Sequence, residues 1–423
     1  MRVLLFSNTP SLAAKSLNKF VAGGSWIESL EYGLMARPDI DLGLVFRQLV
    51  REGREVHSED FRTRYFMVPR YPYGKFARWV NRFFGRTPST RPLKDYMRVV
   101  DEFKPDVVLF FGTESDFPLI IPQLKVPSII WFQGNLTVYD RMYESGIPLR
   151  KTLFTERLKD ILMGDSIYHN YLHFKRLVSR EKKIFSFAEN FIGRTAWDRR
   201  LVQVMSPQAT YYHCDEPMRQ PFLEKTWTPW TDRGKFVIVT TIRGNLYKGL
   251  ETIFETSALV GGLKDLLEWR VIGIEEGSAY AKAARKKAGL ASVETGVKLI
   301  GSLAATEMVE ELLQADLYVH PSHIENSPNA VQEAMILGMP LIATNVGGTP
   351  SLLVDGKEGL LVQNKDPYAM AGAILELFED PEKAKKLGEH ARKRGLVRND
   401  GDEICSQLIR IFEQMCRTKD QGE

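Results

Sequence analysis

The sequence predicts an α/β protein of two domains, each built on a parallel β-sheet that helices cover. The chain has 423 residues, more than a single hydrophobic core normally supports. Short apolar runs alternate with amphipathic stretches along both halves. Between the halves, residues 216–235 are rich in Pro and Trp and lack periodicity, which is typical of a linker. We therefore expect an N-terminal domain at 1–215 and a C-terminal domain at 236–397.

The first half shows the strand–helix alternation less regularly than the second. Strands are expected at 2–7, 106–112 and 127–133, with a further strand and helix across 191–200. A helix is expected to begin near Ser25, directly after Gly23 and Gly24. The glycine pattern of a dehydrogenase dinucleotide site does not follow the first strand, which argues against that class of enzyme.

The second half carries the clearest alternation. Strands are expected at 236–242, 269–274, 297–301, 317–321, 341–344 and 359–362. Helices are expected at about 249–261, 278–289, 305–315, 327–337, 367–378 and 381–395. Such continuous apolar strands indicate a parallel sheet buried on both faces. Open sheets of this kind bind ligands at the carboxyl ends of their strands.

Composition excludes several classes of protein. Hydrophobic residues make up 44% and charged residues 26%, as in ordinary globular proteins. Cys214, Cys405 and Cys416 have no metal-site spacing and are odd in number, which favours a reducing compartment. We expect no signal peptide in MRVLLFSNTP, and no apolar run approaches the about 20 residues needed to span a bilayer. The expected location is cytoplasmic.

The segment from His320 to Gly348 carries the most chemistry. Glu325 follows a buried-type strand, and Ser327 and Pro328 are predicted to be the N-cap and first residue of a helix that contains Glu333. The helix start leaves free backbone N–H groups and the positive end of a dipole beside Glu325. This arrangement suits a ligand that combines a polyhydroxyl group, a diphosphate and a ribose.

A second segment supplies positive charge. Arg243 and Lys248 lie five positions apart in the loop after the strand at 236–242. A departing diphosphate needs positive charge when its bond to a sugar breaks, and Arg and Lys provide it without a metal. The alternative interpretation is a pair of solvated loop cations.

The pair Glu325 and Glu333, with seven residues between them, resembles the paired-glutamate signature of the family 4 glycosyltransferases of bacterial surface glycans. These are retaining GT-B enzymes that use nucleotide-diphosphate sugars. The resemblance implies two Rossmann-like domains with parallel sheets facing a central cleft, and a last helix at about 400–417 that crosses back to the first domain. It implies that Glu325 contacts the donor sugar and that Glu333 holds the ribose.

The same resemblance assigns further donor contacts. The Arg-x4-Lys-Gly spacing resembles the family's phosphate-binding loop, although Ile242 replaces its usual small glycine. Backbone amides facing the sugar and phosphate would come from Asn326, Ser327, Pro328 and Asn329. Gly301 would line the base pocket. Gly23 and Gly24 would let the backbone approach the donor phosphate or the acceptor, or would simply form a hinge.

Gln133 departs from the family pattern, since many members carry a histidine there. Its amide can bond a sugar hydroxyl but cannot exchange a proton near neutral pH. A front-face retaining route, in which the departing phosphate oxygen takes the acceptor proton, needs no such histidine. Glu114 is a further candidate carboxylate, or else a residue that caps a local turn. The predicted catalytic set is thus Glu325, Arg243, Lys248 and Gln133.

No metal and no cofactor are expected beyond the nucleotide sugar itself. His320, His323 and Glu325 look superficially like a metal triad, but Pro321 and Ser322 prevent a helix from aligning the two imidazoles. His169 and His173 stand four apart without a nearby glutamate in a metalloprotease pattern, so packing is the expected role.

Residues 62–94 hold nine Lys or Arg, eight aromatic residues and no Asp or Glu, in a chain whose net charge is only +4. The stretch 75–86 fits a helix with Phe76, Trp79 and Phe83 on one side and cations on the other. Such a helix suits the surface of an anionic membrane, here its inner face. Packing within an acceptor-side lobe is the alternative, and nucleic acid is not an expected partner.

Together these features predict a metal-independent hexosyltransferase of polysaccharide biosynthesis. It would move a sugar from a UDP- or GDP-sugar to a glycan or a lipid-linked glycan. A sugar-nucleotide epimerase and a non-catalytic binding subunit of the same fold are the alternatives. The base, the sugar and the acceptor stay open.

Overall fold

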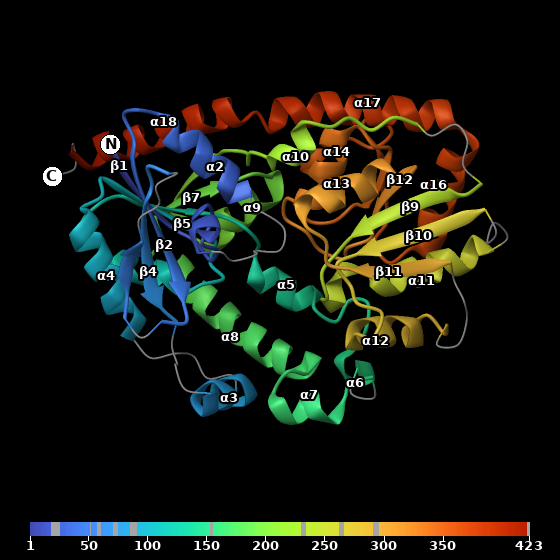
Figure 1. The fold of residues 1–423 in the computed structure, drawn as a ribbon, viewed down its shortest axis with the longest axis horizontal. Helices are drawn as coiled ribbons and strands as arrows, with labels where there is room; N and C mark the ends of the chain where they lie inside the picture. Colours follow the sequence, from blue (N-terminus) through green and yellow to red (C-terminus); the bar gives the residue numbers. More distant parts are fainter. Residues whose placement is uncertain are drawn as a thin grey trace. The chain divides into compact units, whose positions relative to one another are not determined.

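The computed structural model describes residues 1–17, 26–50, 52–56, 61–70, 75–84, 91–152, 155–229, 234–261, 266–290 and 296–420. The chain forms two compact units. The first comprises Met1–Asp140, Lys159–Pro217 and Asp400–Glu423, and the second comprises Arg141–Leu158 and Met218–Asn399. Each unit is built on its own, mostly parallel sheet, which confirms the predicted α/β class (Figure 1).

The first unit holds an eight-stranded sheet in the order β3-β4-β2-β1-β5-β6-β7-β8. Its strands are β1 Arg2–Phe6, β2 Asp41–Gln48, β3 Arg54–Val56, β4 Arg64–Pro69, β5 Val107–Phe111, β6 Ser128–Trp131, β7 Asn190–Gly193 and β8 Thr210–His213. Every neighbouring pair is parallel except β3 and β4. The strands at 2–7, 106–112, 127–133 and within 191–200 were predicted, whereas the prediction lacked β2, β3, β4 and β8.

The first unit also contains helices. They are α1 Ala13–Ser16, α2 Trp26–Met35, α3 Lys75–Phe84, α4 Arg91–Phe103, α8 Ile167–Phe185, α9 Ala196–Met205 and α18 Gly401–Asp420, with a 3₁₀ helix η1 at Phe117–Gln123. Buried aromatic rings fill the space between the sheet and α4 and η1, and the ring of Phe6 lies 5.0 Å from that of Phe110 and 5.4 Å from that of Phe117. These aromatic side chains form the centre of the first core.

The C-terminal helix α18 belongs to the first unit, where the resemblance implied that it would lie. It packs against α2, in a contact so close that a Cβ on Gly33 would lie 2.5 Å from Cys405 Sγ. Arg37 on the chain after α2 also donates to Ser406 Oγ at 3.1 Å. The last helix of the chain therefore packs within the same unit as the first strand.

The second unit holds a six-stranded, wholly parallel sheet in the order β11-β10-β9-β12-β13-β14. Its strands are β9 Phe236–Thr241, β10 Leu267–Ile272, β11 Val297–Gly301, β12 Leu317–His320, β13 Leu341–Thr344 and β14 Leu360–Val362. All six were predicted, with ends within two residues. Their side chains are mostly buried, as expected for a parallel sheet covered on both faces.

Six helices described in the second unit were predicted, with ends within three residues, and three helices of four residues each were not. They are α6 Leu149–Thr152, α10 Gln220–Leu223, α11 Leu250–Leu259, α12 Ala279–Lys287, α13 Ala305–Leu313, α14 Asn329–Leu337, α15 Thr349–Leu352, α16 Pro367–Glu379 and α17 Pro381–Arg398, with a 3₁₀ turn η2 at Leu246–Lys248. Two further helices, α5 Leu136–Met142 and α7 Leu158–Met163, cross the boundaries between the units. The long helix α17 packs along α14 (Figure 1).

Two segments join the second unit in a way that the sequence did not predict. The described part of the expected linker is packed, because Trp227 donates its backbone N–H to Leu337 O at 2.8 Å and its indole N–H to Ala315 O at 2.7 Å. Residues 141–158, expected in the first domain, also group with the second unit, and the ring of Tyr143 lies 6.0 Å from that of Tyr247. Local periodicity does not reveal such a crossover, because it depends only on distant packing partners.

None of the helices in the described ranges combines the length and the apolar content that crossing a membrane requires.

Candidate functional site

A cation and a carboxylate meet at the carboxyl edge of the second sheet. β9 and β12 are neighbouring parallel strands, so the loops that follow them leave the sheet at the same edge. Lys248 follows β9, Glu325 follows β12, and Lys248 Nζ lies 2.6 Å from Glu325 Oε1. These residues stand 77 positions apart, so the sheet joins two motifs that the sequence presents separately.

A glycine explains why Lys248 reaches this position. Lys248 ends the 3₁₀ turn η2, and the next residue, Gly249, has a φ of 74° in the left-handed region. A Cβ at Gly249 would lie 2.1 Å from Pro321 O, the backbone of the loop after β12. Only glycine permits this approach, which holds the Lys248 turn against the segment that leads to Glu325.

The environment of Glu325 keeps it ionised. Burial by itself would raise the pKa of this carboxyl, but the Lys248 ammonium and the hydrogen bond from His320 outweigh it and hold the pKa at about 2. His320 Nε2 lies 3.0 Å from the same Oε1 that Lys248 contacts. In the described part of the chain no side chain forms a hydrogen bond or an ion pair with Oε2. That oxygen can accept a hydrogen bond from a ligand hydroxyl.

Arg243 is the second cation of this loop. It is exposed, and its guanidinium forms no ion pair with any residue of the described ranges. Lys248 already has a carboxylate partner, so Arg243 is the cation whose charge is directly available to an anion. The role of Arg243 as a phosphate contact stays a prediction.

The helix after Glu325 begins later than predicted. α14 starts at Asn329, and Pro328 rather than Ser327 is its N-cap, with φ −68° and ψ 111°. Instead, Ser327 Oγ accepts from Gln332 Nε2 at 3.1 Å. The helix starts later because Pro328 itself has the extended ψ of 111° and so cannot be the first helical residue. The backbone N–H groups of Asn329 and Ala330 have no acceptor among the described residues, so the helix still presents donors at this edge.

Glu333 is held by an arginine that the sequence did not single out. Arg219 Nε and Nη2 lie 2.9 Å and 2.6 Å from Glu333 Oε1, and both side chains are largely buried. Burial raises the pKa of Glu333, and the Arg219 charge opposes this rise only in part. Arg219 lies in the Pro-rich stretch before α10, where no local pattern marks it as a site residue.

Replacing Arg219 by Met is expected to cost about 3 kcal/mol of unfolding free energy, because Glu333 would remain buried without a counter-charge. Urea unfolding monitored by circular dichroism measures the loss. The matched control is Arg285→Met, which breaks the pair with the exposed Glu276 and should cost less than about 1 kcal/mol. Equal losses in the two variants would contradict a buried ion pair at Glu333.

The two histidines of the suspected metal triad face different carboxylates. His323 Nε2 lies 2.5 Å from Glu251 Oε1 and its Nδ1 lies 2.6 Å from Asn364 Oδ1, whereas His320 contacts Glu325. Across the described ranges, no three His, Cys, Asp or Glu residues are grouped so that they could hold a metal ion. These histidines instead orient the loop between β12 and α14.

The remaining predicted donor residues occupy separate places. Gly301 ends β11 with a φ of 84°, at the same edge of the sheet but three strands from β12 in the strand order. Asn326 and Ser327 are buried in the loop before α14. Gly23 and Gly24 lie outside the described residues.

In the first unit, Gln133 and Glu114 share one edge of the sheet. They follow the neighbouring strands β6 and β5, and both side chains flank Gly112, whose Cβ would meet Glu114 Oε2 at 1.8 Å and Gln133 Cγ at 3.0 Å. The backbone N–H groups of Glu114 itself and of Gly134 lower the pKa of this carboxyl, but not enough to offset its burial.

Glu114 titrates near neutral pH. Burial raises its pKa to about 7, the nearby Glu181 carboxyl adds to the rise, and Arg194 opposes it. Its Oε2 is buried without a hydrogen-bond partner. Glu181 itself accepts from Thr113 Oγ1 at 2.7 Å and Thr137 Oγ1 at 2.6 Å. A group that can exchange a proton thus lies beside Gln133, which cannot.

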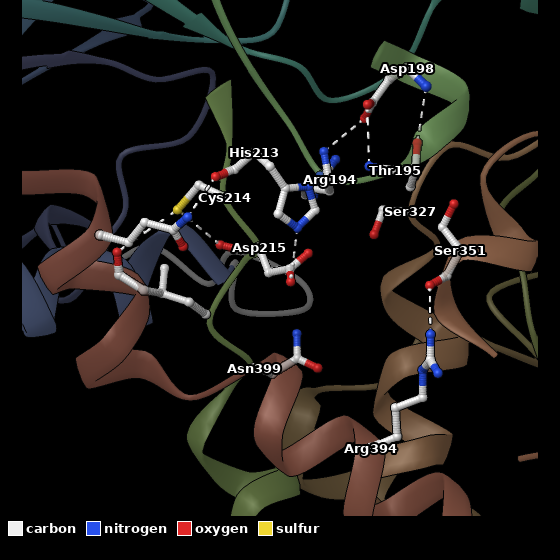
Figure 2. A network of polar contacts seen from close by, with 12 residues as sticks. Arg194, Thr195, Asp198, His213, Cys214, Asp215, Ser327, Ser351, Arg394 and Asn399 are labelled. Carbon is white, nitrogen blue, oxygen red and sulfur yellow. Dashed lines mark hydrogen bonds and ion pairs between the residues drawn. The ribbon is translucent and has the colours of Figure 1, made fainter. Parts of the chain in front are cut away.

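The segment at 191–200 has the strand-then-helix form that was predicted, and its polar residues have structural roles. Figure 2 shows the Asp198 carboxylate accepting from the backbone N–H groups of Arg194 and Thr195, at 2.9 Å and 3.2 Å. Thr195 Oγ1 accepts in return from the Asp198 backbone N–H, which completes a capping box for α9. The buried Arg194 side chain pairs with Glu216 at 2.8 Å and donates to Gln133 O at 3.1 Å. Arg194 therefore fixes the end of β6.

Residues 228–394 match the family model described as glycosyl transferases group 1. Over these residues the second unit is therefore similar to the group 1 glycosyl transferases. The match includes Arg243, Lys248, Glu325 and Glu333, and it ends within the second unit.

Curated relatives match a part of the chain. D-inositol 3-phosphate glycosyltransferase of Corynebacterium urealyticum is 27% identical over 130 residues, 31% of this chain and 30% of the relative. Glycogen synthase of Mycobacterium tuberculosis is 32% identical over 115 residues, 27% of this chain and 28% of the relative. These alignments span about three tenths of the length of either relative.

Solved structures share the fold along almost the whole chain. Sucrose-phosphate synthase from Thermosynechococcus elongatus superposes with a TM-score of 0.72 at 16% identity, over 99% of both chains. Alr3699/HepE from Anabaena, solved with UDP and glucose, has a TM-score of 0.63 at 14% identity over 98% of this chain and 99% of that one. The architecture is thus of the GT-B type, as the resemblance implied.

Proposed function

We propose that the protein transfers a sugar from a nucleotide-diphosphate sugar to a hydroxyl group of an acceptor. One observation carries this proposal: the contact between Lys248 and Glu325 beside the start of α14, within the residues that match the group 1 glycosyl transferases. The contact brings three groups to one place. They are a cation for a diphosphate, an ionised carboxylate that can accept hydrogen bonds from sugar hydroxyls, and the free N–H groups of a helix start.

Arg243 and Lys248 act on the leaving group. The bond between the sugar anomeric carbon and the diphosphate oxygen breaks during transfer, and negative charge grows on that oxygen. Two cations placed for that charge lower the barrier, since electrostatic stabilisation acts most strongly where charge develops. Glu325 offers Oε2 to a sugar hydroxyl and so orients the ring.

Glu333 is assigned to the ribose, with Arg219 holding its Oε1 so that the carboxyl has one orientation. Gly301 lines the base pocket in this proposal. A UDP-sugar is the preferred donor over a GDP-sugar, because two structural neighbours carry uridine ligands: Alr3699/HepE with UDP-glucose and the trehalose-6-phosphate protein from E. coli with UDP-2-fluoro glucose.

The proposed stereochemistry is retention, with no metal and no cofactor. The new bond from the acceptor oxygen forms on the face that the diphosphate leaves, and the departing phosphate oxygen takes the acceptor proton. Gln133 then binds a hydroxyl without exchanging a proton. The proposed acceptor is a glycan or lipid-linked glycan, which fits a family 4-like enzyme of polysaccharide biosynthesis at the inner face of a membrane.

A thermal-shift panel of UDP, GDP and ADP, with their common sugar conjugates and with and without EDTA, tests the donor site. A ligand that binds only the folded protein, and is present at a hundred times its Kd, stabilises the folded protein by about 2.7 kcal/mol. We expect UDP and one UDP-sugar to raise the melting temperature, and we expect EDTA to change neither of these shifts. Arg243→Ala should reduce this shift, because the guanidinium of Arg243 forms no ion pair among the described residues and is available to the diphosphate.

The matched control is Lys385→Ala, which removes an exposed cation from α17 and should leave the UDP shift unchanged. The absence of a shift with every nucleotide, or an equal shift for Arg243→Ala and the parent, would overturn the donor assignment. Release of UDP that depends on an added glycan separates transfer from epimerisation, which needs the donor alone.

A further inference from the structure

Large apolar side chains stand exposed on three neighbouring elements of the first unit. The exposed fraction is 76% for Phe76 and 59% for Leu162. We define this surface as the apolar ledge, which consists of Phe76 and Phe84 on α3, Leu162 and Met163 on α7, and Tyr168 on α8. Exposed apolar side chains gathered in this way mark an interaction surface rather than ordinary surface variation.

Printed contacts hold these elements together. The Trp79 indole N–H donates to Leu162 O at 3.1 Å, which joins α3 to α7. The ring of Phe83 lies 4.8 Å from that of His169, and Arg176 donates to Phe84 O, which joins α3 to α8 (Figure 1). The predicted aromatic face of α3 is therefore divided: Phe83 and Trp79 turn toward the unit, and Phe76 stacks on Trp79 at 5.8 Å from the outside.

The sequence of α3 and of its flanking stretch is basic. α3 has the sequence KFARWVNRFF, with three cations and no acid in ten residues. It lies within the stretch 62–94, whose nine Lys and Arg are accompanied by no Asp or Glu. On α7 and the turn after it, Asp160 and Asp165 are the acidic residues and Lys159 offsets one of them. In the sequences of α3, α7 and the turn after α7, the cations therefore outnumber the acids.

We propose that the apolar ledge inserts into the interface of a bilayer that contains anionic lipid, to which the basic sequence of α3 is attracted. A short basic helix with exposed aromatic and aliphatic side chains is the form that lies in a membrane interface. Anionic headgroups attract the cations, and Trp and Tyr favour the boundary between headgroups and acyl chains. Nucleic acid would bind the cations but would leave Phe76 and Leu162 in water.

The ledge deepens the proposed function, because it would bring the enzyme to a lipid-linked acceptor, but it does not depend on the donor site. The ledge belongs to the first unit and shares no residue with the Lys248–Glu325 site. Failure of the ledge and failure of sugar transfer are therefore distinguishable, since binding to vesicles can be measured without any nucleotide sugar.

The test is sedimentation of the full chain with vesicles of phosphatidylcholine alone and with vesicles that also contain phosphatidylglycerol. We expect binding to the anionic vesicles only. The double variant Phe76→Ser, Leu162→Ser should bind at least roughly tenfold more weakly, since each side chain loses its transfer into the interface. The matched control is Tyr368→Ser on α16 of the second unit, which removes a side chain of similar exposure, 74%, and should bind like the parent.

Salt separates insertion from simple charge attraction. High salt screens the cations, so a surface held by charge alone would release fully, whereas inserted side chains keep part of the binding. A second variant, Met163→Ser, guards against a folding failure in the double variant. Equal binding of the parent and the ledge variants, binding by the parent to RNA but not to vesicles, or no vesicle binding at all would each overturn the proposal.

Discussion

The variant Lys248→Met is expected to lose about 3 kcal/mol of unfolding free energy and about a hundredfold to a thousandfold of its sugar-transfer rate. The loss of stability follows from Glu325, which has its Oε1 2.6 Å from Lys248 Nζ and is buried. Removing the ammonium leaves that carboxylate with His320 as its remaining partner. The loss of rate follows from the cation that would face the departing diphosphate.

A second substitution separates these two effects. In the double variant Lys248→Met, Glu325→Gln, the carboxylate no longer needs a counter-charge, so most of the stability should return. The transfer rate should stay low, because neither the cation nor the carboxylate is restored. Urea unfolding and UDP release in the presence of acceptor measure the two quantities. Recovery of the rate together with the stability would show that Lys248 has only a structural role.

Lys298→Met provides the matched control. Lys298 also pairs with a glutamate, Glu268 at 2.7 Å, but its side chain is 65% exposed. Its removal should change the unfolding free energy by less than about 1 kcal/mol.

The Lys248 effect should also depend on pH. The folded-state pKa of Glu325 lies near 2, below its ordinary value of 4.5, so the stabilisation is complete above about pH 4.5 and is lost as the pH falls toward 2. The stabilities of the parent and of Lys248→Met should therefore converge in acid.

The variant Glu114→Gln is expected to become more stable than the parent as the pH rises. The parent carboxyl has its pKa raised from 4.5 to about 7, so the folded protein holds the proton more tightly than the unfolded chain does. Its contribution to stability is fully present below about pH 4.5 and is lost as the pH rises through 7. Glutamine has the same shape and does not ionise, so the variant does not lose stability as the pH rises through 7.

The expected gain of Glu114→Gln over the parent, between pH 4 and pH 8, is about 3 kcal/mol, from a pKa change of roughly 2.5 and 1.36 kcal/mol for each pKa unit. Thermal or urea unfolding at a series of pH values measures it. Glu102→Gln, which alters an exposed glutamate of the same unit, should show no such trend. A flat difference between Glu114→Gln and the parent would contradict the buried, neutral carboxyl.

Much of the second unit could be predicted from local pattern. Its strands are apolar and its helices amphipathic, so the two periodicities alternate along the chain and mark each element. The end of α14 was also correct, because Gly338 adopts the left-handed conformation that glycine favours, with a φ of 86°. The start of α14 was wrong: serine at an N-cap and proline at the first helical position are both common, but here the chain stays extended through Pro328.

The first unit was predicted less completely because two of its strands lack a clear alternation of apolar and polar residues. β4 reads as RYFMVP within a basic stretch, and β3 has only three residues, so neither shows a clear alternation. The placement of 141–158 in the second unit, and of the Arg219 side chain on Glu333, rests on contacts between segments far apart in sequence. Such contacts have no local signal.

By itself the sequence determined the α/β class, the order of the elements in the second half and the types of residue at the candidate site. The physical reason is that strand and helix periodicity, and the charges of Arg243, Lys248, Glu325 and Glu333, are properties of the local chain. Only the tertiary structure decided that Lys248 touches Glu325, that Arg219 holds Glu333, that burial raises the pKa of Glu114 beside Gln133, and that Trp79 donates to Leu162. Those facts depend on which strands are neighbours and on how deeply each group is buried, and both are set by the packing of the whole chain.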